Sequence, residues 1–414
     1  MASRGSHLVR ADRHFATGAG LVGRLFAPLF ARVVDQLDRR LLTGGIDATL
    51  PNGSGRRVGF HAPGPEAVVN IHHWKALVRL VTSGSVGWYK AWAAGEWSSP
   101  DPVPLFELFA ANATSLQDTA RAKGPARWIN ASAHRLRDNA PKQARQNIAA
   151  HYDLGNDFYT AWLDDSMTYS SARFAAGDNL EAGQNRKIAA LLDRLDLHPG
   201  DSLLEIGCGW GSLAIEAARR GVTVVGLTLS AEQKSWADTK IDEAKLSDQI
   251  EIRLQDYREI DERFDAIASV EMVEAVGQRY WSAYLDCIYS NLKPGGKAAL
   301  QFISIDRRLF DRYAANADFI QTYIFPGGML LDELHFEALA KARGLGWHDR
   351  NGFAADYAET LSIWRTRYDD AVREGRLAEF DEEFHNLWRY YLMYCEGAFR
   401  GRTIDVAQVT LNRF

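Results

Sequence analysis

From about residue 151 onward, short apolar runs alternate with longer stretches whose apolar residues recur at helical spacing. The short runs predict strands and the longer stretches predict helices. The predicted strands are Ser202–Ile206, Thr223–Leu227, Ile250–Leu254, Phe264–Val270 and Lys297–Ser304. The predicted helices include Leu213–Arg220, Ala231–Ala244 and Tyr280–Asn291. This alternation predicts an α/β fold with a parallel sheet that binds its ligand at the carboxyl ends of the strands.

The first part of the chain has a different pattern. Residues up to about 115 mix a possible helix, short strand-like runs and turns, which predicts a smaller α+β domain. Within it, the apolar stretch from Gly23 to Arg40 carries basic residues; it could lie in a membrane interface or pack on its own domain. We expect an accessory domain over 1–115, for lipid or membrane binding or dimerisation, a basic linker over 116–147, and a catalytic domain over 148–414.

The strand Ser202–Ile206 leads directly into a glycine-rich turn, Gly207-Cys208-Gly209-Trp210-Gly211. Glycine lets backbone N–H groups approach a ligand closely. The spacing is G-x-G-x-G rather than the G-x-G-x-x-G of dinucleotide sites, and the next strand ends in Thr228 rather than an acid. With the carboxylate of Glu205 just before the turn, the pattern indicates S-adenosylmethionine rather than a nicotinamide.

Two further loops follow the next strands, at Thr228–Gln233 and at Asp256-Tyr257. Because the carboxyl ends of parallel strands meet at one edge of a sheet, we expect all three loops to border one crevice.

Composition narrows the classes of function. The chain has 414 residues and a formal net charge of −5, which argues against nucleic-acid binding driven by global charge. Its three cysteines are too few and too scattered for a disulfide framework or a zinc cluster, so we expect no metal site and a reducing, cytoplasmic setting. The C-terminal third is rich in aromatic residues, most of them expected in the core, with Tyr357 and Tyr394 as candidates for an acyl-chain cavity.

Several ordered motifs resemble those of the cyclopropane-fatty-acyl-phospholipid synthases and their relatives, the mycolic acid cyclopropane synthases. They cover roughly Gln146 to the C-terminus and are the following: His151-Tyr152-Asp153-Leu154-Gly155-Asn156-Asp157-Phe158-Tyr159, Met167-Thr168-Tyr169-Ser170-Ser171, Glu205–Gly211, Gly226–Gln233 and Phe325-Pro326-Gly327-Gly328. The resemblance implies a Rossmann-like class I methyltransferase with a seven-stranded sheet, helical insertions and S-adenosylmethionine as cofactor. Together with the glycine turn, it gives the expected cofactor-binding residues: Tyr169, Ser170, Glu205, Gly207, Gly209, Gly211, Thr228, Leu229, Gln233, Asp256 and Tyr257.

The resemblance also implies a bicarbonate ion that acts as a base beside the reacting carbon. Its expected ligands, and so the expected catalytic residues, are Glu274, Tyr357, Cys395, Gln301, Ser171 and Ile303, the last through its backbone. This chain departs from the family pattern at two of them, with Ser171 in place of cysteine and Gln301 in place of histidine. Glutamine donates a hydrogen bond to an anion but relays no proton, so binding or basicity of the ion is in question here.

We therefore expect a C-methyltransferase that acts on the double bonds of unsaturated phospholipid acyl chains at the inner face of the membrane. The family resemblance also suggests a homodimer. One alternative is a related enzyme that forms methylene- or methyl-branched chains, because the position of the base decides the product. Another is an inert lipid-binding paralogue with a degraded base site. A methyltransferase for small molecules is disfavoured by the aromatic C-terminal third and the basic linker.

Overall fold

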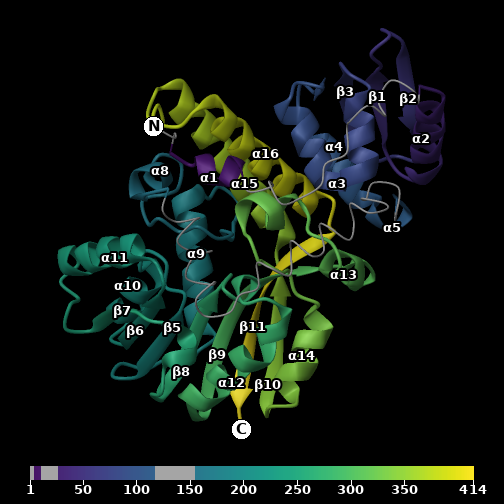
Figure 1. The fold of residues 1–414 in the computed structure, drawn as a ribbon. Coiled ribbons are helices and arrows are strands. Elements are labelled where there is room, and N and C mark those ends of the chain that lie inside the picture. The colour runs from purple at the N-terminus through teal and green to yellow at the C-terminus, as the bar shows by residue number, and fades with distance from the viewer. Residues whose placement is uncertain (1–3, 11–26, 117–153) are drawn as a thin grey trace. The chain divides into compact units, whose positions relative to one another are not determined.

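A seven-stranded mixed sheet carries the predicted glycine turn (Figure 1). The computed structural model describes residues 4–10, 27–116 and 154–414, without the side chains of 27–33. The strand order is β10-β11-β9-β8-β5-β6-β7. The strands are β5 (Ser202–Ile206), β6 (Thr223–Thr228), β7 (Ile250–Leu254), β8 (Phe264–Val270), β9 (Leu292–Ile305), β10 (Leu345–Gly352) and β11 (Ile404–Arg413). Neighbours from β9 through β7 pair in parallel, whereas β10 and β11 are antiparallel. The α/β fold and the five predicted strands are confirmed.

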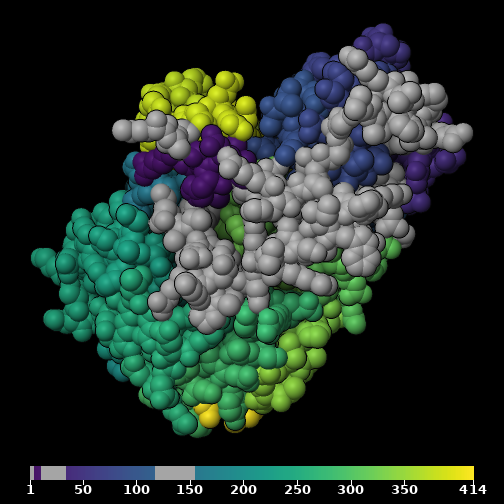
Figure 2. Space-filling model, viewed as in Figure 1, coloured from purple at the N-terminus to yellow at the C-terminus, as the bar shows by residue number. Residues whose placement is uncertain are grey.

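Three helices cover one face of this sheet: α9 (Leu180–Asp193), α10 (Ser212–Arg219) and α11 (Ala231–Glu243). Their apolar residues form one buried cluster with residues of the strands. The helices alternate with strands in the sequence, which is the arrangement expected for parallel crossovers. In the space-filling view, this part of the molecule is the closed teal surface (Figure 2).

The other elements around the sheet include α12 (Trp281–Asn291) and α14 (Glu333–Lys341), which pack on each other and on β9 and β10. Short segments follow several strands and shape the loops. The remaining elements of this part of the chain are α8 (Asn156–Thr160), η3 (Tyr257–Glu259), η4 (Val273–Ala275), η5 (Gln278–Tyr280) and α15 (Ala354–Arg373).

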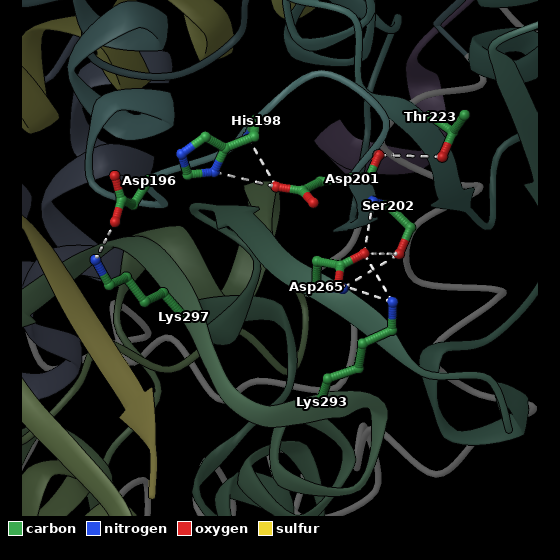
Figure 3. Close-up of polar contacts among 8 residues, drawn as sticks. All are labelled: Asp196, His198, Asp201, Ser202, Thr223, Asp265, Lys293 and Lys297. Carbon is green, nitrogen blue, oxygen red and sulfur yellow. Dashed lines mark hydrogen bonds and ion pairs between the residues drawn. The ribbon is translucent and has the colours of Figure 1, made fainter.

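Asp265 ties together three segments at the amino end of the sheet (Figure 3). Its carboxylate accepts hydrogen bonds from the backbone N and the hydroxyl of Ser202, at 2.9 and 2.7 Å, and forms an ion pair with Lys293 at 2.8 Å. Burial raises the pKa of this carboxyl, but Lys293 and Ser202 outweigh burial and lower it to about 2. The network fixes the starts of β5, β8 and β9, and thereby the strands whose far ends form the site.

The described residues fall into two compact units that are interleaved along the sequence. One unit contains the sheet described above and runs to the C-terminus. The other combines the N-terminal residues with residues 308–326 and 379–404. These two segments were expected in the catalytic domain, but they pack with the N-terminal residues. The basic linker, apart from Leu116, lies outside the described residues.

The N-terminal unit is built on a four-stranded sheet of order β2-β1-β3-β4. Its strands are β1 (Gly45–Thr49), β2 (Gly55–Gly59), β3 (Glu66–Ile71) and β4 (Trp97–Ser98). Its helices are α1 (Ser6–Val9), α2 (Ala27–Arg40), α3 (Lys75–Ala93), α4 (Val103–Ala111), α5 (Ala113–Leu116), α13 (Arg307–Ala314), η6 (Ile320–Ile324) and α16 (Glu382–Arg400). Val34 and Leu37 of α2 are buried in this unit, and Asp38 accepts a hydrogen bond from Gly59 of β2. Among the described residues, no helix is long and apolar enough to cross a membrane.

Helix α16 lies unusually close to α4. A Cβ atom on Gly397 would stand 2.4 Å from the Cβ of Phe106, and one on Gly401 would stand 2.4 Å from the Cβ of Ala110. The two glycines are one helical turn apart, so they lie on the same face of α16, and the absence of side chains there lets α4 pack closely. Tyr390 of α16 adds ring contacts to Tyr89 and to Phe106 within the same unit.

Candidate active site

A pocket opens at the carboxyl ends of β5, β6 and β8. Nine of the expected cofactor residues line it: Tyr169, Ser170, Glu205, Gly207, Gly209, Thr228, Leu229, Gln233 and Tyr257. The three loops that were expected to border one crevice therefore do so, although they are far apart in the sequence.

The glycine turn requires backbone angles that other residues rarely adopt. Gly207 and Gly209 have φ values of 82° and 53°. A Cβ atom on Gly209 would meet no protein atom within 4 Å, although Gly209 lines the pocket. The open space above this backbone is what a closely approaching ligand needs.

Glu205 places a buried carboxyl group in the lining of the pocket. It is only 3% exposed, and its Oε2 atom is buried with no hydrogen-bond partner. Burial raises the pKa of this carboxyl to about 8, against a smaller effect of the Lys187 charge. An unpaired buried carboxylate oxygen costs free energy until a donor reaches it. The α-ammonium group of S-adenosylmethionine is such a donor, so the residues present fit this cofactor.

Helix α9 fixes the segment that contains Tyr169 and Ser170. Gln184 donates hydrogen bonds to the carbonyl oxygens of Thr168 and Ser170, and Lys187 donates to the Ser170 hydroxyl at 2.7 Å. Lys187 is 1% exposed, and burial lowers its pKa to about 8, although the charges of Glu271, Asp164 and Glu205 partly oppose this shift. It is a buried cation placed among carboxylates, and it also lines the pocket.

Directly after β8, the carboxylate of Glu271 collects hydrogen bonds from three distant parts of the chain. Oε1 accepts from the backbone N of Ser171 at 3.0 Å and from Nε2 of Gln301 at 2.8 Å. Oε2 accepts from the hydroxyl of Tyr357 at 2.7 Å. Burial raises the pKa of this carboxyl, and the three hydrogen bonds oppose that shift. Glu271 also lines the pocket.

The amide of Gln301 is oriented by a second glutamine. Gln408 of β11 donates from Nε2 to Oε1 of Gln301 at 3.0 Å. Arg173 in turn donates to Oε1 of Gln408 at 3.2 Å. This chain of hydrogen bonds leaves the amide nitrogen of Gln301 directed at Glu271.

Glu274 lies one turn farther on, in η4. Its Oε1 accepts a hydrogen bond from the backbone N of Ile303, while its Oε2 is buried without a partner. Burial raises the pKa of Glu274 to about 8, and the charge of Glu271 adds to the shift. Glu274 is one of the six expected catalytic residues, and four others surround the two glutamates: Ser171, Gln301, Ile303 and Tyr357.

The donors that the resemblance assigns to a bicarbonate ion are thus already bound. Ser171 and Gln301 donate to Glu271, Tyr357 donates to Glu271, and the backbone of Ile303 donates to Glu274. As these side chains stand, they do not fit an additional anion.

The remaining three expected site residues are not among those that line the pocket. Gly211 does not line the pocket but begins α10, where a Cβ would stand 3.1 Å from the Cβ of Ala237. Asp256 does not line it either, and its carboxylate binds the backbone and guanidinium of Arg258. Cys395 belongs to α16 of the N-terminal unit, so its role at this site stays a prediction.

Aromatic rings stand behind Tyr169 of the pocket wall. Its ring lies 5.3 to 5.6 Å from those of Tyr159, Trp162 and Trp364. Trp364 in turn meets the ring of Tyr357 edge-on at 6.2 Å. Tyr169 is therefore backed by buried aromatic rings, which extend to Tyr357, the residue that donates to Glu271.

Two residues of the pocket with ionisable side chains, Lys187 and Glu271, were missed by the sequence analysis. Lys187 sits within an amphipathic helix, where lysine normally faces solvent. Glu271 directly follows a predicted strand but was assigned no role. The usable signal for Glu271 was a second glutamate three residues before Glu274, directly after a strand on the ligand side of the sheet.

Comparisons with known proteins agree with this geometry. The sequence model of mycolic acid cyclopropane synthetase matches residues 139–409. The chain is 36% identical over 399 residues to tuberculostearic acid methyltransferase UfaA1 of Mycobacterium tuberculosis, covering 92% of this chain and 91% of that protein. It is 34% identical over 372 residues to cyclopropane-fatty-acyl-phospholipid synthase of Escherichia coli, covering 87% and 91%.

Among solved structures, the mycolic acid cyclopropane synthase CmaA1 in complex with S-adenosylhomocysteine (SAH) and CTAB matches with a TM-score of 0.61 and 31% identity. The match covers 65% of this chain and 98% of that structure. The chain belongs to the mycolic acid cyclopropane synthetase family and is an S-adenosylmethionine-dependent methyltransferase.

Proposed function

We propose that this enzyme methylates a carbon–carbon double bond in unsaturated fatty-acyl chains of phospholipids. The proposal rests on one observation. A cofactor pocket, the aromatic rings around Tyr169 and the partly buried pair Glu271 and Glu274 lie together at one edge of the sheet. The cofactor, when bound, supplies an electrophilic methyl group.

The residues of the wall suit the charge that forms on the substrate. An alkene that gains a methyl group becomes a carbocation, which needs a water-poor environment and nearby negative charge. The ring of Tyr169 in the pocket lining offers a π face, and Glu271 offers a carboxylate. Oxygen and nitrogen nucleophiles need none of these features, so the arrangement favours transfer to carbon.

The lipid class rests on the relatives. The Escherichia coli relative is a cyclopropane-fatty-acyl-phospholipid synthase, and the match to it extends over most of both chains. A phospholipid substrate requires contact with a bilayer surface. We therefore propose peripheral association with the inner face of the membrane. We also propose that the enzyme is a homodimer.

A second product is a methylene- or methyl-branched chain. It is favoured by the match, over nearly the full length, to a protein described as a tuberculostearic acid methyltransferase. Both products share the first step. Direct loss of a proton from the added methyl group closes a cyclopropane, whereas a hydride shift from the methylated carbon to the cationic carbon before that loss gives a methylene group.

The test is incubation of the full chain with methyl-labelled S-adenosylmethionine and vesicles of monounsaturated phospholipid. Saturated phospholipid vesicles are the matched control. Label in the unsaturated lipid alone supports the proposal, and proton NMR of that lipid separates a cyclopropane from a methylene group, which have the same mass. Tight cofactor binding without transfer to any unsaturated lipid would contradict the proposal and favour the inert paralogue.

A further inference from the structure

We propose that the carboxylate of Glu271 is the base that removes the proton in the last step of the reaction, in the place where the family resemblance puts a bicarbonate ion. The inference rests on the proposed function, because it assigns a residue to that reaction.

The first argument is the set of donors around Glu271. A segment before α9, strand β9 and helix α15 each supply one donor, from Ser171, Gln301 and Tyr357. A carboxylate has about four acceptor positions, so three of them are filled and one remains for an incoming proton. The three hydrogen bonds hold this oxygen pair in one orientation beside the pocket.

The second argument is the backbone. Glu271 has a φ of 48°, in the left-handed region that residues other than glycine rarely adopt. Such a conformation is strained and persists only where the surroundings hold it. The N–H of Glu271 donates to the carbonyl oxygen of Gln301 at 2.7 Å, and the side chain is held by the three donors. Strain held in this way is common at functional sites.

The third argument is the combination of Glu271 with Gln301. A glutamine donates a hydrogen bond without bringing a positive charge, whereas a protonated histidine would lower the basicity of the adjacent carboxylate. Burial raises the pKa of Glu271. A neutral donor therefore keeps the carboxylate basic. The presence of Glu271 thus explains why residue 301 is glutamine rather than histidine in this chain.

The step balances without any further reactant. The π electron pair of the alkene forms the bond to the methyl carbon, while the C–S pair stays on sulfur and leaves a cation on the second alkene carbon. Glu271 then takes a proton from the added methyl group, and the C–H electron pair closes the third bond of the ring. Removal of a different proton, by the same oxygen, gives an alkene.

The variant that tests this is Glu271→Gln. Its Oε1 can accept from Ser171 and Gln301, and its amide can donate to the hydroxyl of Tyr357, so the shape of the site is kept while the base is lost. We expect label transfer to fall about 10²–10⁴-fold, the range for loss of a general base. Glu262→Gln, an exposed glutamate before β8 that pairs with Arg253, is the matched control and should keep wild-type activity.

Glu271→Gly removes the side chain at a position whose backbone suits glycine. We expect formate or bicarbonate to restore its label transfer at least tenfold, whereas wild-type activity should be the same in buffer depleted of carbon dioxide. A Glu271→Gln enzyme within threefold of wild type, or a wild-type enzyme that requires added bicarbonate, would overturn the proposal.

A binding measurement separates this proposal from the proposed function. In ¹³C NMR with labelled bicarbonate, the Glu271→Gly protein should bind the ion and the wild type should not. If the wild type methylates no lipid at all, the proposed function fails, yet this measurement still decides the place of Glu271. Equal bicarbonate binding by both proteins would contradict it.

Discussion

Lys187, Glu205 and Glu271 are the ionisable acidic and basic residues of a pocket whose lining mixes polar and apolar side chains. The ammonium of Lys187 interacts with both carboxylates, and its hydrogen bond to Ser170 reaches the segment that was expected to contact the cofactor. Buried charges of this kind are costly unless they pair with one another or with a ligand. We expect the charged groups of the bound cofactor to pair with these side chains and so offset the cost of burying them.

Lys187→Met should weaken binding of S-adenosylhomocysteine about tenfold, which is roughly the loss of one charge-assisted hydrogen bond. Methionine retains the packing of the side chain but leaves Ser170 without its donor and the carboxylates without a cation. Titration calorimetry measures the change. Lys293→Met, at the amino end of the sheet, is the control, and equal affinity of the two variants would argue against a role for Lys187.

Cofactor binding should depend on pH through Glu205. Its pKa is raised to about 8 by burial, so at pH 6.5 the free carboxyl is mostly protonated. An ammonium ligand favours the ionised form, so binding must release a proton and affinity should rise by up to tenfold per pH unit until about pH 8. Lys187, with a pKa of about 8, loses its positive charge as the pH rises through that value, so its titration does not increase cofactor affinity with pH.

Calorimetry in buffers of different ionisation enthalpy measures the released proton. In Glu205→Gln the rise with pH should be absent. A wild-type affinity that stays constant from pH 6.5 to 8 would show that Glu205 does not meet the ligand's ammonium group.

At the scale of elements, the strands that form the site were predictable and those at the far side of the sheet were not. Strands β5 to β8 are apolar runs between helices, and their observed bounds agree closely with the predicted ones. Strand β10 reads Leu-Gly-Trp-His-Asp-Arg-Asn-Gly and is mostly exposed, so it has no hydrophobic period. Strand β11 buries the polar residues Gln408 and Thr410, which interrupts its apolar pattern.

The site was predictable to a similar extent. Local motifs identified the loops around the cofactor pocket, because each loop carries its signal in consecutive residues. The Glu271 cluster joins residues 171, 271, 301 and 357, and no short-range pattern connects them. Only the folded sheet brings these residues together.

The amino end of the sheet should contribute stability rather than activity. Asp265→Asn removes the ion pair with Lys293 and weakens the bonds to Ser202, at a cost of about 1–2 kcal/mol. For a unit of this size we expect the melting temperature to fall by about 2–8 °C. Asp196→Asn, which breaks the exposed pair with Lys297, is the control and should change little. A large loss of kcat in Asp265→Asn at a temperature where it remains folded would contradict this assignment.

The contact between α16 and α4 should tolerate no added methyl group at Gly397. Alanine favours helix by about 1 kcal/mol over glycine, but its Cβ would overlap the Cβ of Phe106 and approach Glu107 N at 2.8 Å. Overpacking costs about 1–3 kcal/mol, so the net effect of Gly397→Ala is destabilising. Thermal unfolding measures it. Gly55→Ala, where a Cβ meets nothing within 4 Å, should be neutral, and equal melting of the two variants would refute the close contact.

At the scale of the whole molecule, the interleaved units determine how the chain can be divided. Helix α16 packs with α4, α3 and α1, which all come from the N-terminal residues. Removal of residues 1–115 would expose its buried face, including Phe384, Tyr390 and Phe399. The match to CmaA1 covers only 65% of this chain. In this chain, α16 has Gly397 where α4 packs closely against it, and Gly401 directly after the helix makes a second close contact with α4.

We therefore expect the truncated chain 116–414 to aggregate, or to melt well below the full chain. Size-exclusion chromatography and thermal unfolding of both proteins at equal concentration provide the measurement. A monodisperse truncated protein with an unchanged melting temperature would mean that α16 does not depend on the N-terminal residues.

The interleaving also sets an order of events on the ribosome. The first unit begins with residues near the start of the chain but needs the segments 308–326 and 379–404 to be complete. An N-terminal domain usually folds as soon as it has emerged. Here nearly the entire polypeptide must be synthesised before that unit can complete its core. Apolar side chains near the start of the chain, such as Tyr89 and Phe106, therefore stay exposed until the later segments have been made. Nascent chains of this enzyme are thus natural clients for chaperones that shield exposed aromatic surface.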